Sequence, residues 1–319
     1  MPLYKLEFST RGIHIGGVKF RKMLLLLRLH QMPAGLVPVM VGLAYAWWKT
    51  GAFNFSSALA VFLLTGFTLL GAACLDDYFD HRSGVDAKVE NRTLLSGGSG
   101  LIQTGKWNAR TVLGLGIAAL ASALFLAVGL TVTGTNRALA GVYAFGILSV
   151  IFYAAPPLSA AYRGWGELLI AVNFGPTALE LGYASQTGTF SLRLFPVALI
   201  FSGLILVVHL LHEVLDYEAD QVAGKKGWVV LLGLEKSKKL ISLLLVAPFV
   251  LLLFSVVLKL LPFSALLPLG AVTSAIGILK RIKRAENQEM FFPILAESFL
   301  LHVVFGLLLV TGLVLERWI

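Results

Sequence analysis

Charged side chains are scarce in this chain. Asp, Glu, Lys and Arg make up 13% of its 319 residues, and 57% of the residues are hydrophobic. A soluble domain carries about 25% charged residues, so the composition excludes an ordinary soluble protein and indicates a chain solvated by lipid. Cys74 is the only cysteine, which excludes an intrachain disulfide. No small-residue cleavage site follows a short apolar core near the N-terminus, so we expect no signal peptide.

Long apolar stretches take the place of the missing charges. A membrane-spanning helix needs roughly 17 to 25 such residues. Nine stretches are present, at about 23–48, 55–77, 110–132, 136–155, 165–186, 192–215, 238–258, 264–279 and 292–315. Arg28, His30 and Pro33 interrupt the first, and the eighth is short, so the count lies between eight and ten. We expect an all-α, polytopic membrane protein of about nine transmembrane helices, with residues 1–319 forming one domain.

Positive charge is distributed unevenly over the predicted loops. With nine spans, 21 of the 26 Lys and Arg residues fall on one side, in the N-terminal segment and the loops after even-numbered spans. Positively charged loops stay in the cytoplasm. We therefore expect a multi-pass cell-membrane protein whose N-terminal segment 1–22 and even-numbered loops are cytoplasmic. The net charge of +9 follows from this topology and from phosphate binding, and we expect no nucleic-acid partner.

Acidic residues concentrate in two of these loops. One reads CLDDYFDHRSGVDAKVENRTLLSGGSG (74–100) and the other HLLHEVLDYEADQVAGKKGWVVLLG (209–233). With Glu235 just beyond, they hold ten of the 17 Asp and Glu residues. Asp77 and Asp216 are 139 residues apart, and Asp80 and Asp220 are 140 apart. Each motif closes an apolar helix, and an even number of helices separates them, so both should emerge on one face. This pattern suggests a parallel internal repeat, with the ligand site at the repeat interface.

The spacing within each motif predicts a metal site. On a helix, Glu213, Asp216 and Asp220 fall within about 60° of one another, with His209 on the same stripe, whereas Asp76, Asp77 and Asp80 span about 100°. Crowded carboxylates repel one another unless a cation lies among them, and Mg²⁺ takes one or two carboxylates plus substrate phosphate oxygens. We therefore expect Mg²⁺ on a diphosphate between the two motifs. The remaining phosphate charge would be neutralised by Lys88, Arg92, Lys225 and Lys226.

These residues resemble the UbiA superfamily of intramembrane prenyltransferases, in which about nine helices surround a central cavity. The first motif, Asp76-Asp77-Tyr78-Phe79-Asp80 with Asp86 displaced, resembles the dihydroxynaphthoate-prenylating MenA branch of menaquinone biosynthesis. So do Asp216 to Asp220 with the following AGKK, the segments YAAPPL (153–158) and YRGWGE (162–167), and FGP (174–176) before YASQTG (183–188). Arg28 lies where the family has an Arg-Pro. His212, Gln221 and Gly227 depart from the family pattern.

The resemblance implies residue roles. Asp76, Asp77, Asp80, Asp216 and Asp220 would hold Mg²⁺ on an isoprenyl diphosphate, whose other oxygens would meet Arg92, Lys225 and Lys226. Aromatic faces tolerate an allylic cation, which makes Tyr78, Tyr153 and Tyr162 candidates. Polar residues within the spans, namely Asn173, His209, Glu213, Glu297 and His302, could shape a pocket for an aromatic acceptor, and no residue is singled out as a general base.

Three alternatives stay open at this point. Another acceptor, such as hydroxybenzoate, a porphyrin or an archaeal glycerol phosphate, would suit the same motifs. A transporter would explain the helices and the interrupted fifth span, but not two matching acidic motifs with basic followers. A soluble prenyl chain-elongating synthase would explain a literal DDxxD at Asp76 to Asp80, but the hydropathy excludes its fold.

Overall fold

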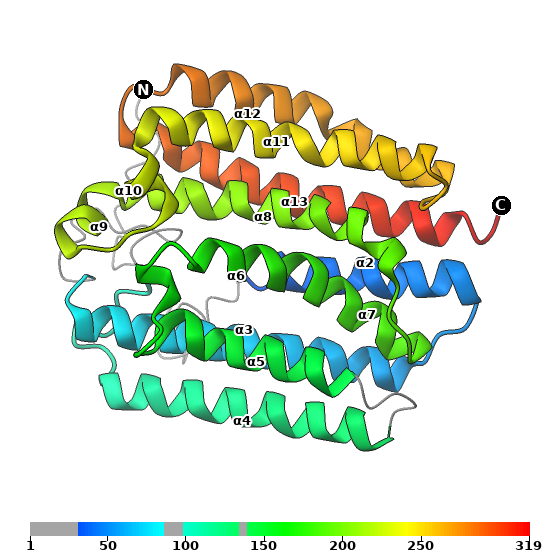
Figure 1. Ribbon diagram of the computed structural model, residues 1–319, viewed down its shortest axis with the longest axis horizontal. Coiled ribbons are helices and arrows are strands. Elements are labelled where there is room, and N and C mark those ends of the chain that lie inside the picture. Colours follow the sequence, from blue (N-terminus) through cyan, green and yellow to red (C-terminus); the bar gives the residue numbers. More distant parts are fainter. Residues whose placement is uncertain (1–30, 86–97, 134–138) are drawn as a thin grey trace, which may run out of the picture.

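Long apolar helices lie side by side along one direction (Figure 1). The structure is a computed structural model that describes residues 31–85, 98–133 and 139–319, and these residues form helices and loops without a strand. The elements are α2 Pro33–Thr50, α3 Phe55–Ser83, α4 Ala109–Thr133, α5 Leu139–Ala154, η3 Ala160–Tyr162, α6 Gly166–Val172, η4 Asn173–Thr177, α7 Ala178–Thr187, η5 Leu192–Leu194, α8 Phe195–Leu215, α9 Tyr217–Ala223, α10 Trp228–Leu232, α11 Leu234–Val257, η6 Phe263–Ala271, α12 Val272–Arg284, η7 Gln288–Met290 and α13 Phe291–Leu315. The all-α prediction is confirmed for this part of the chain.

Six helical segments of the described chain are long and apolar enough to cross a membrane, so the protein is a multi-pass membrane protein. They are Phe55–Ser83, Ala109–Thr133, Leu192–Leu215, Leu234–Val257, Phe263–Arg284 and Gln288–Glu316. The other predicted spans fall on α2, on the shorter apolar helix Leu139–Ala154 and on the interrupted α6–η4–α7 segment. The count of nine spans therefore stays a prediction. The internal repeat and the single-domain assignment stay predictions too.

Helix α8 lies in the middle of the bundle. It packs against α11 and α13 on one side and against α6 and η4 on the other, while α3, α4 and α5 form a separate group (Figure 1). Accordingly, α8 side chains such as Phe201, Leu204 and Leu210 are almost fully buried. The second acidic motif follows directly from this central helix.

Helices α2 and α7 are held together by close backbone approach. A Cβ atom on Gly42 would lie 2.1 Å from the Leu179 carbonyl oxygen, and one on Gly182 would lie 2.2 Å from the Val39 carbonyl oxygen. Small residues allow such contacts between membrane helices, where packing rather than water expulsion drives association. The pair fixes the position of α2, whose Ala34 lines the cavity described below.

The predicted break at FGP is a widened helical turn. Residues Asn173–Thr177 form a π-helical turn between α6 and α7. Pro176 lacks an N–H group, and the Ser202 hydroxyl of α8 donates to the Ala171 carbonyl instead, at 2.7 Å. Gly175 permits this contact, since a Cβ there would lie 2.1 Å from Ser202 Oγ. Such turns occur frequently at functional sites, and Asn173 and Phe174 of this one line the cavity described below.

Both acidic motifs lie at the same end of the bundle, where α3 and α8 end and α9 and α10 cover them (Figure 1). Helix α3 ends at Gly84, whose φ of 80° is the left-handed conformation that favours glycine. The two motifs therefore lie at a common end of the bundle, as predicted.

Candidate active site

The first acidic motif occupies the last turns of α3. Asp77 is 2% exposed and its Oδ1 accepts a 3.1 Å hydrogen bond from the Ser99 N–H. Asp80 Oδ1 accepts a 2.5 Å hydrogen bond from the Tyr162 hydroxyl, which also lies 2.8 Å from Ser83 Oγ. Asp76 lines the cavity. The fan of carboxylates predicted from helical spacing therefore divides, with one member in the cavity wall and two engaged by neighbouring loops.

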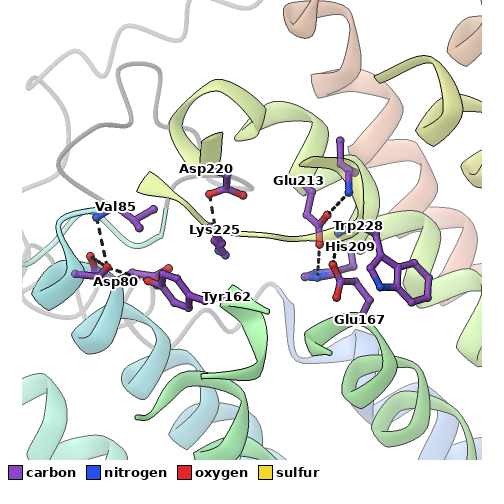
Figure 2. Close-up of polar contacts among 11 residues, drawn as sticks. Asp80, Val85, Tyr162, Glu167, His209, Glu213, Asp220, Lys225 and Trp228 are labelled. Carbon is purple, nitrogen blue, oxygen red and sulfur yellow. Dashed lines mark hydrogen bonds and ion pairs between the residues drawn. The ribbon is translucent and has the colours of Figure 1, made fainter. Parts of the chain in front are cut away.

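The second motif is divided by a turn. Helix α8 ends at Leu215, Asp216 caps it with φ −97° and ψ 5°, and α9 begins at Tyr217. The single continuous stripe expected for Glu213, Asp216 and Asp220 is therefore wrong, because the helix is interrupted between its members. Asp220 turns toward Lys225, whereas Glu213 turns toward α6 and α10 (Figure 2).

Lys225 lies between the two motifs. Its Nζ is 3.9 Å from Asp220 Oδ1 and 5.6 Å from the centre of the Tyr162 ring. Burial lowers the pKa of Lys225, but the carboxylates of Asp80 and Asp220 outweigh burial and hold that pKa well above its ordinary value. The ammonium group is therefore charged and neutralises part of both motifs.

Burial also affects the two groups beside Lys225. It raises the pKa of Asp220 to about 6, against the lowering effect of Lys225. It raises the pKa of Tyr162 as well, and the Asp80 carboxylate adds to this effect. The Tyr162 hydroxyl is thus a proton-bearing donor to Asp80 at neutral pH.

Backbone hydrogen bonds fix the loop that carries Lys225. The Lys225 N–H donates to the Asp220 carbonyl at 2.9 Å, and the Lys226 N–H donates to the Tyr162 carbonyl at 3.2 Å. The Trp228 indole N–H donates to the Gly164 carbonyl at 3.0 Å. The segments YRGWG (162–166) and GKKGW (224–228), which are far apart in the sequence, therefore form one unit over the acidic motifs.

Two buried carboxyl groups accept hydrogen bonds from the backbone that follows this loop. Glu167 Oε1 accepts from the Trp228 N–H at 2.5 Å, and Glu213 Oε2 accepts from the Val229 N–H at 2.9 Å (Figure 2). Glu213 Oε1 lies 3.1 Å from His209 Nε2. Glu167 and Glu213 are 1% and 7% exposed, so both carboxyl groups are shielded from water and depend on hydrogen bonds from the protein.

An apolar cavity of about 260 Å³ opens beside these groups. Its polar lining combines Asp76, Tyr153, His209 and His212 with Ser149 and Asn173, while Leu69, Phe174 and Phe299 contribute apolar surface. Asn173 Oδ1 accepts from the Ser149 hydroxyl at 3.0 Å. An apolar chamber lined by Asp76 and by few other polar groups suits an amphiphilic ligand, whose anionic head group a metal ion on this carboxylate would bind.

The structure places the sequence-predicted residues in three groups. The first group lines the cavity and consists of Asp76, Tyr153, Asn173 and His209. The second group lies outside the lining and consists of Asp80, Tyr162, Asp220 and Lys225, which contact one another. The third is Glu213, which accepts a hydrogen bond from α10 and is not among the described lining residues. The exposed Lys226 contributes its backbone N–H, and Tyr78 stacks edge-on against Phe79 at 5.1 Å. Arg28, Lys88 and Arg92 lie outside the described residues, as do Asp86 and the segment 1–22. The catalytic and binding roles stay predictions.

Two of the other intramembrane polar residues have structural partners. Glu297 pairs with Arg281, and His302 Nε2 lies 2.9 Å from the Ala34 carbonyl oxygen. Glu167, the last residue of the segment YRGWGE (162–167), contacts the site although the sequence alone suggested no role for it. The available signal was an acidic residue at the very start of an apolar span, where charge is costly and tends to be functional.

No three His, Cys, Asp or Glu side chains of the described residues converge as a ready-made metal cage. The donor set nevertheless fits Mg²⁺, because this ion binds through one or two carboxylates per site together with phosphate oxygens and water. Such carboxylates are present in both motifs, as Asp76 and Asp80 in the first and Asp216 and Asp220 in the second. The phosphate oxygens of the ligand and water would complete the coordination.

The UbiA prenyltransferase family model matches residues 35–313 of the chain. The chain belongs to this family. It is therefore a prenyltransferase of the membrane. A 2-carboxy-1,4-naphthoquinone phytyltransferase from Synechocystis is 27% identical over 301 residues, covering 87% of this chain and 88% of the relative. A 1,4-dihydroxy-2-naphthoate octaprenyltransferase from Bacillus subtilis is 24% identical over 212 residues, 65% of each chain.

A solved structure supports the fold. A UbiA homolog from Archaeoglobus fulgidus, bound to GPP and Mg²⁺, superposes with a TM-score of 0.65 at 20% identity, covering 91% of this chain and 99% of the homolog. The helical arrangement is therefore the UbiA fold.

Proposed function

We propose that this enzyme transfers the prenyl group of an isoprenyl diphosphate to 1,4-dihydroxy-2-naphthoate or a closely related aromatic acid, with Mg²⁺ as cofactor. The observation that carries the proposal is the meeting of Asp80, Lys225 and Asp220 at the end of the bundle where Asp76 lines an apolar cavity. The naphthoate-type acceptors named for two relatives support the choice of acceptor. The diphosphate and Mg²⁺ in the homolog structure support the choice of donor and metal.

Each part of the site has a task in this reaction. Asp76, Asp77, Asp80, Asp216 and Asp220 would hold Mg²⁺, which neutralises charge developing on the diphosphate leaving group. Lys225 contributes a fixed positive charge between the same carboxylates. The apolar cavity takes the prenyl chain and excludes water from the allylic cation. Tyr153, at the cavity wall, presents an aromatic ring that tolerates this cation.

The orientation in the membrane belongs to the same proposal. The acidic motifs, the N-terminal segment and the basic loops would face the cytoplasm. The polar groups of both substrates, the diphosphate and the carboxylate, would be in contact with water on that side. The excess of Lys and Arg in these loops supports that direction.

A defined assay tests the proposal. The purified protein is given radiolabelled geranyl to geranylgeranyl diphosphate and a panel of acceptors, with Mg²⁺ or with EDTA. We expect Mg²⁺-dependent prenylation of the naphthoate, lost in Asp80→Ala and Asp216→Ala. Full activity of either variant contradicts the metal assignment. Turnover of only hydroxybenzoate, a porphyrin or a glycerol phosphate contradicts the acceptor assignment, and donor binding without turnover contradicts prenyl transfer altogether.

A further inference from the structure

His209 presents one ring nitrogen to a carboxylate and lies in the cavity wall. Its Nε2 is 3.1 Å from Glu213 Oε1, one turn further along α8, and the ring lines the cavity together with Asp76 and Tyr153. We propose that His209 is the general base that accepts the hydroxyl proton of the aromatic acceptor, with Glu213 as its positioning residue. This inference rests on the proposed function, because it needs an acceptor that carries an acidic hydroxyl.

The contact with Glu213 fixes the useful tautomer of the ring. A carboxylate accepts hydrogen bonds, so it retains the proton on Nε2 and leaves the lone pair on Nδ1. Because Nε2 is engaged by Glu213, Nδ1 is the ring nitrogen that can meet a ligand in the cavity that His209 lines. A base oriented by a second group, with its other nitrogen toward the substrate, is the arrangement by which enzymes activate hydroxyl groups.

The neighbouring His212 has a different environment. It also lines the cavity, but its Nδ1 lies 2.9 Å from the Val208 carbonyl of its own helix. This nitrogen of His212 therefore contacts its own helix, whereas Nε2 of His209 contacts a buried acid. The difference singles out His209 as the residue whose imidazolium would be stabilised.

Glu213 itself is held from two directions. Its Oε2 accepts from the Val229 N–H at 2.9 Å, and its carboxyl group is within hydrogen-bonding reach of Glu167. A hydrogen bond between two carboxyl groups requires one of them to carry a proton, and Glu167 Oε2 meets no donor among the described residues. Glu167 can thus donate to Glu213, which keeps its charge for His209.

Gly227 makes this geometry possible. A Cβ at this position would lie 2.8 Å from Glu213 Oε2 and 2.9 Å from Cδ. Any larger residue would press on the carboxyl group unless Glu213 moved. Gly227 departs from the motif of the resembling family, and in the structure it lies against the carboxyl group of the positioning residue Glu213.

The proton and electron balance closes without another reactant. The acceptor hydroxyl gives its proton to His209 Nδ1, and the ring carbon forms a bond to the prenyl carbon as the bond from that carbon to the diphosphate oxygen breaks. Diphosphate leaves with the electron pair. Where the attacked carbon bears a carboxylate, CO₂ departs and the electrons of the broken C–C bond restore the aromatic phenolate. Where that carbon bears hydrogen, the departed diphosphate takes this proton and the electrons of the C–H bond restore the ring. In both cases His209 returns its proton to the phenolate.

Several titratable groups surround His209. They are Glu213 and His212 from α8, Glu167 from α6, Asp76 from α3, Tyr153 from α5, Asp220 from α9 and Lys225 from the α9–α10 connection. Because Glu213 Oε1 lies 3.1 Å from the ring, a proton taken up by His209 forms an ion pair with this carboxylate rather than an isolated buried charge.

The test compares His209→Asn and Glu213→Gln with the wild-type enzyme, in the full-length protein with Mg²⁺, prenyl diphosphate and a hydroxylated aromatic acceptor. General-base catalysis contributes about 10²- to 10⁴-fold, so we expect kcat of His209→Asn to fall at least about 100-fold. The KM for the donor should stay within threefold, and added imidazole should restore part of kcat. Glu213→Gln, which can still accept from the Val229 N–H, should lose less, about tenfold. Glu235→Gln, on an exposed side chain, is the matched control.

Each outcome decides the assignment. Wild-type kcat in His209→Asn overturns it, and so does a rise in donor KM that parallels the fall in kcat without imidazole rescue, since that pattern indicates a structural role. If the wild-type enzyme rejects the naphthoate but prenylates another phenol, the proposed acceptor fails while the base is still tested on that phenol. Turnover of only a non-aromatic acceptor overturns both.

Discussion

The hydroxyl of Tyr162 donates a 2.5 Å hydrogen bond to Asp80, although 82 residues separate them in the sequence. The carbonyl of the same tyrosine accepts from the Lys226 N–H at 3.2 Å. Tyr162 therefore connects the first acidic motif with the loop that follows the second. Its ring also faces the ammonium group of Lys225. The sequence suggested a role for this residue through its aromatic face, and the structure adds the hydroxyl.

Removal of this hydroxyl should weaken donor binding. In Tyr162→Phe, Asp80 loses a charge-assisted hydrogen bond worth about 1.5–3 kcal/mol. We expect kcat/KM for the prenyl diphosphate to fall about 10- to 100-fold, with the ring position unchanged. Steady-state kinetics at saturating acceptor measure this. Tyr183→Phe, which stacks with Tyr45 away from the site, is the control, and equal losses in both variants would contradict a specific role.

Replacement of the central cation should change the response to metal. In Lys225→Met, the carboxylates of Asp80 and Asp220 lose the charge that they share. We expect turnover to be lost and the apo protein to be less stable, and Mg²⁺ alone should raise Tm more than it does in the wild type. Thermal unfolding in detergent with and without Mg²⁺ measures this. The exposed Lys239→Met serves as control. An unchanged Mg²⁺ response in Lys225→Met would show that the ammonium does not substitute for metal charge.

The contact between α2 and α7 should tolerate no added carbon. In Gly42→Ala, the new methyl group would lie 2.1 Å from the Leu179 carbonyl, so the helices must separate. Overpacking of this kind costs about 1–3 kcal/mol, and we expect a lower Tm together with weaker substrate binding. Gly129→Ala, where no atom lies within 4 Å, is the matched substitution and should leave Tm unchanged. Equal Tm values for the two variants would contradict the helix pairing.

The proposed orientation can be measured with single cysteines. Cys74 is the only cysteine of the chain, so a Cys74→Ser background contains no thiol of its own. We expect a membrane-impermeant thiol reagent to label Thr189→Cys in intact cells, and Lys239→Cys only after the cells are opened. Both positions are exposed, and they lie at opposite ends of the bundle. The reverse labelling pattern would place the acidic motifs outside.

Much of this architecture could be predicted because it is local in the sequence. The apolar runs give the helices, and the even number of spans between Asp80 and Asp220 gives their common end. The residue types at both helix ends give the family and its chemistry. These features depend on composition, hydrophobic length and motif spacing, which are all visible in one chain.

The rest depends on contacts between distant segments. Nothing in the spacing indicates that Asp216 interrupts the second helix, because the same residues would form a continuous stripe on a straight one. The meeting of Glu167 with Glu213 requires α6 and α8 to pack side by side at a particular rotation. The partner of Glu213 was therefore missed, and its side chain was expected in the acceptor pocket instead.

Lys225 has a further consequence for how the enzyme loads its ligands. Its ammonium group interacts electrostatically with both Asp80 and Asp220. A change in the charge of one carboxylate therefore changes the strength of the interaction between Lys225 and the other. Thermodynamic reciprocity then requires that an ion bound at one helix end changes the affinity of the other end by the same factor in both directions. We therefore expect an ion bound at one acidic motif to change the affinity of the other motif for its own ion.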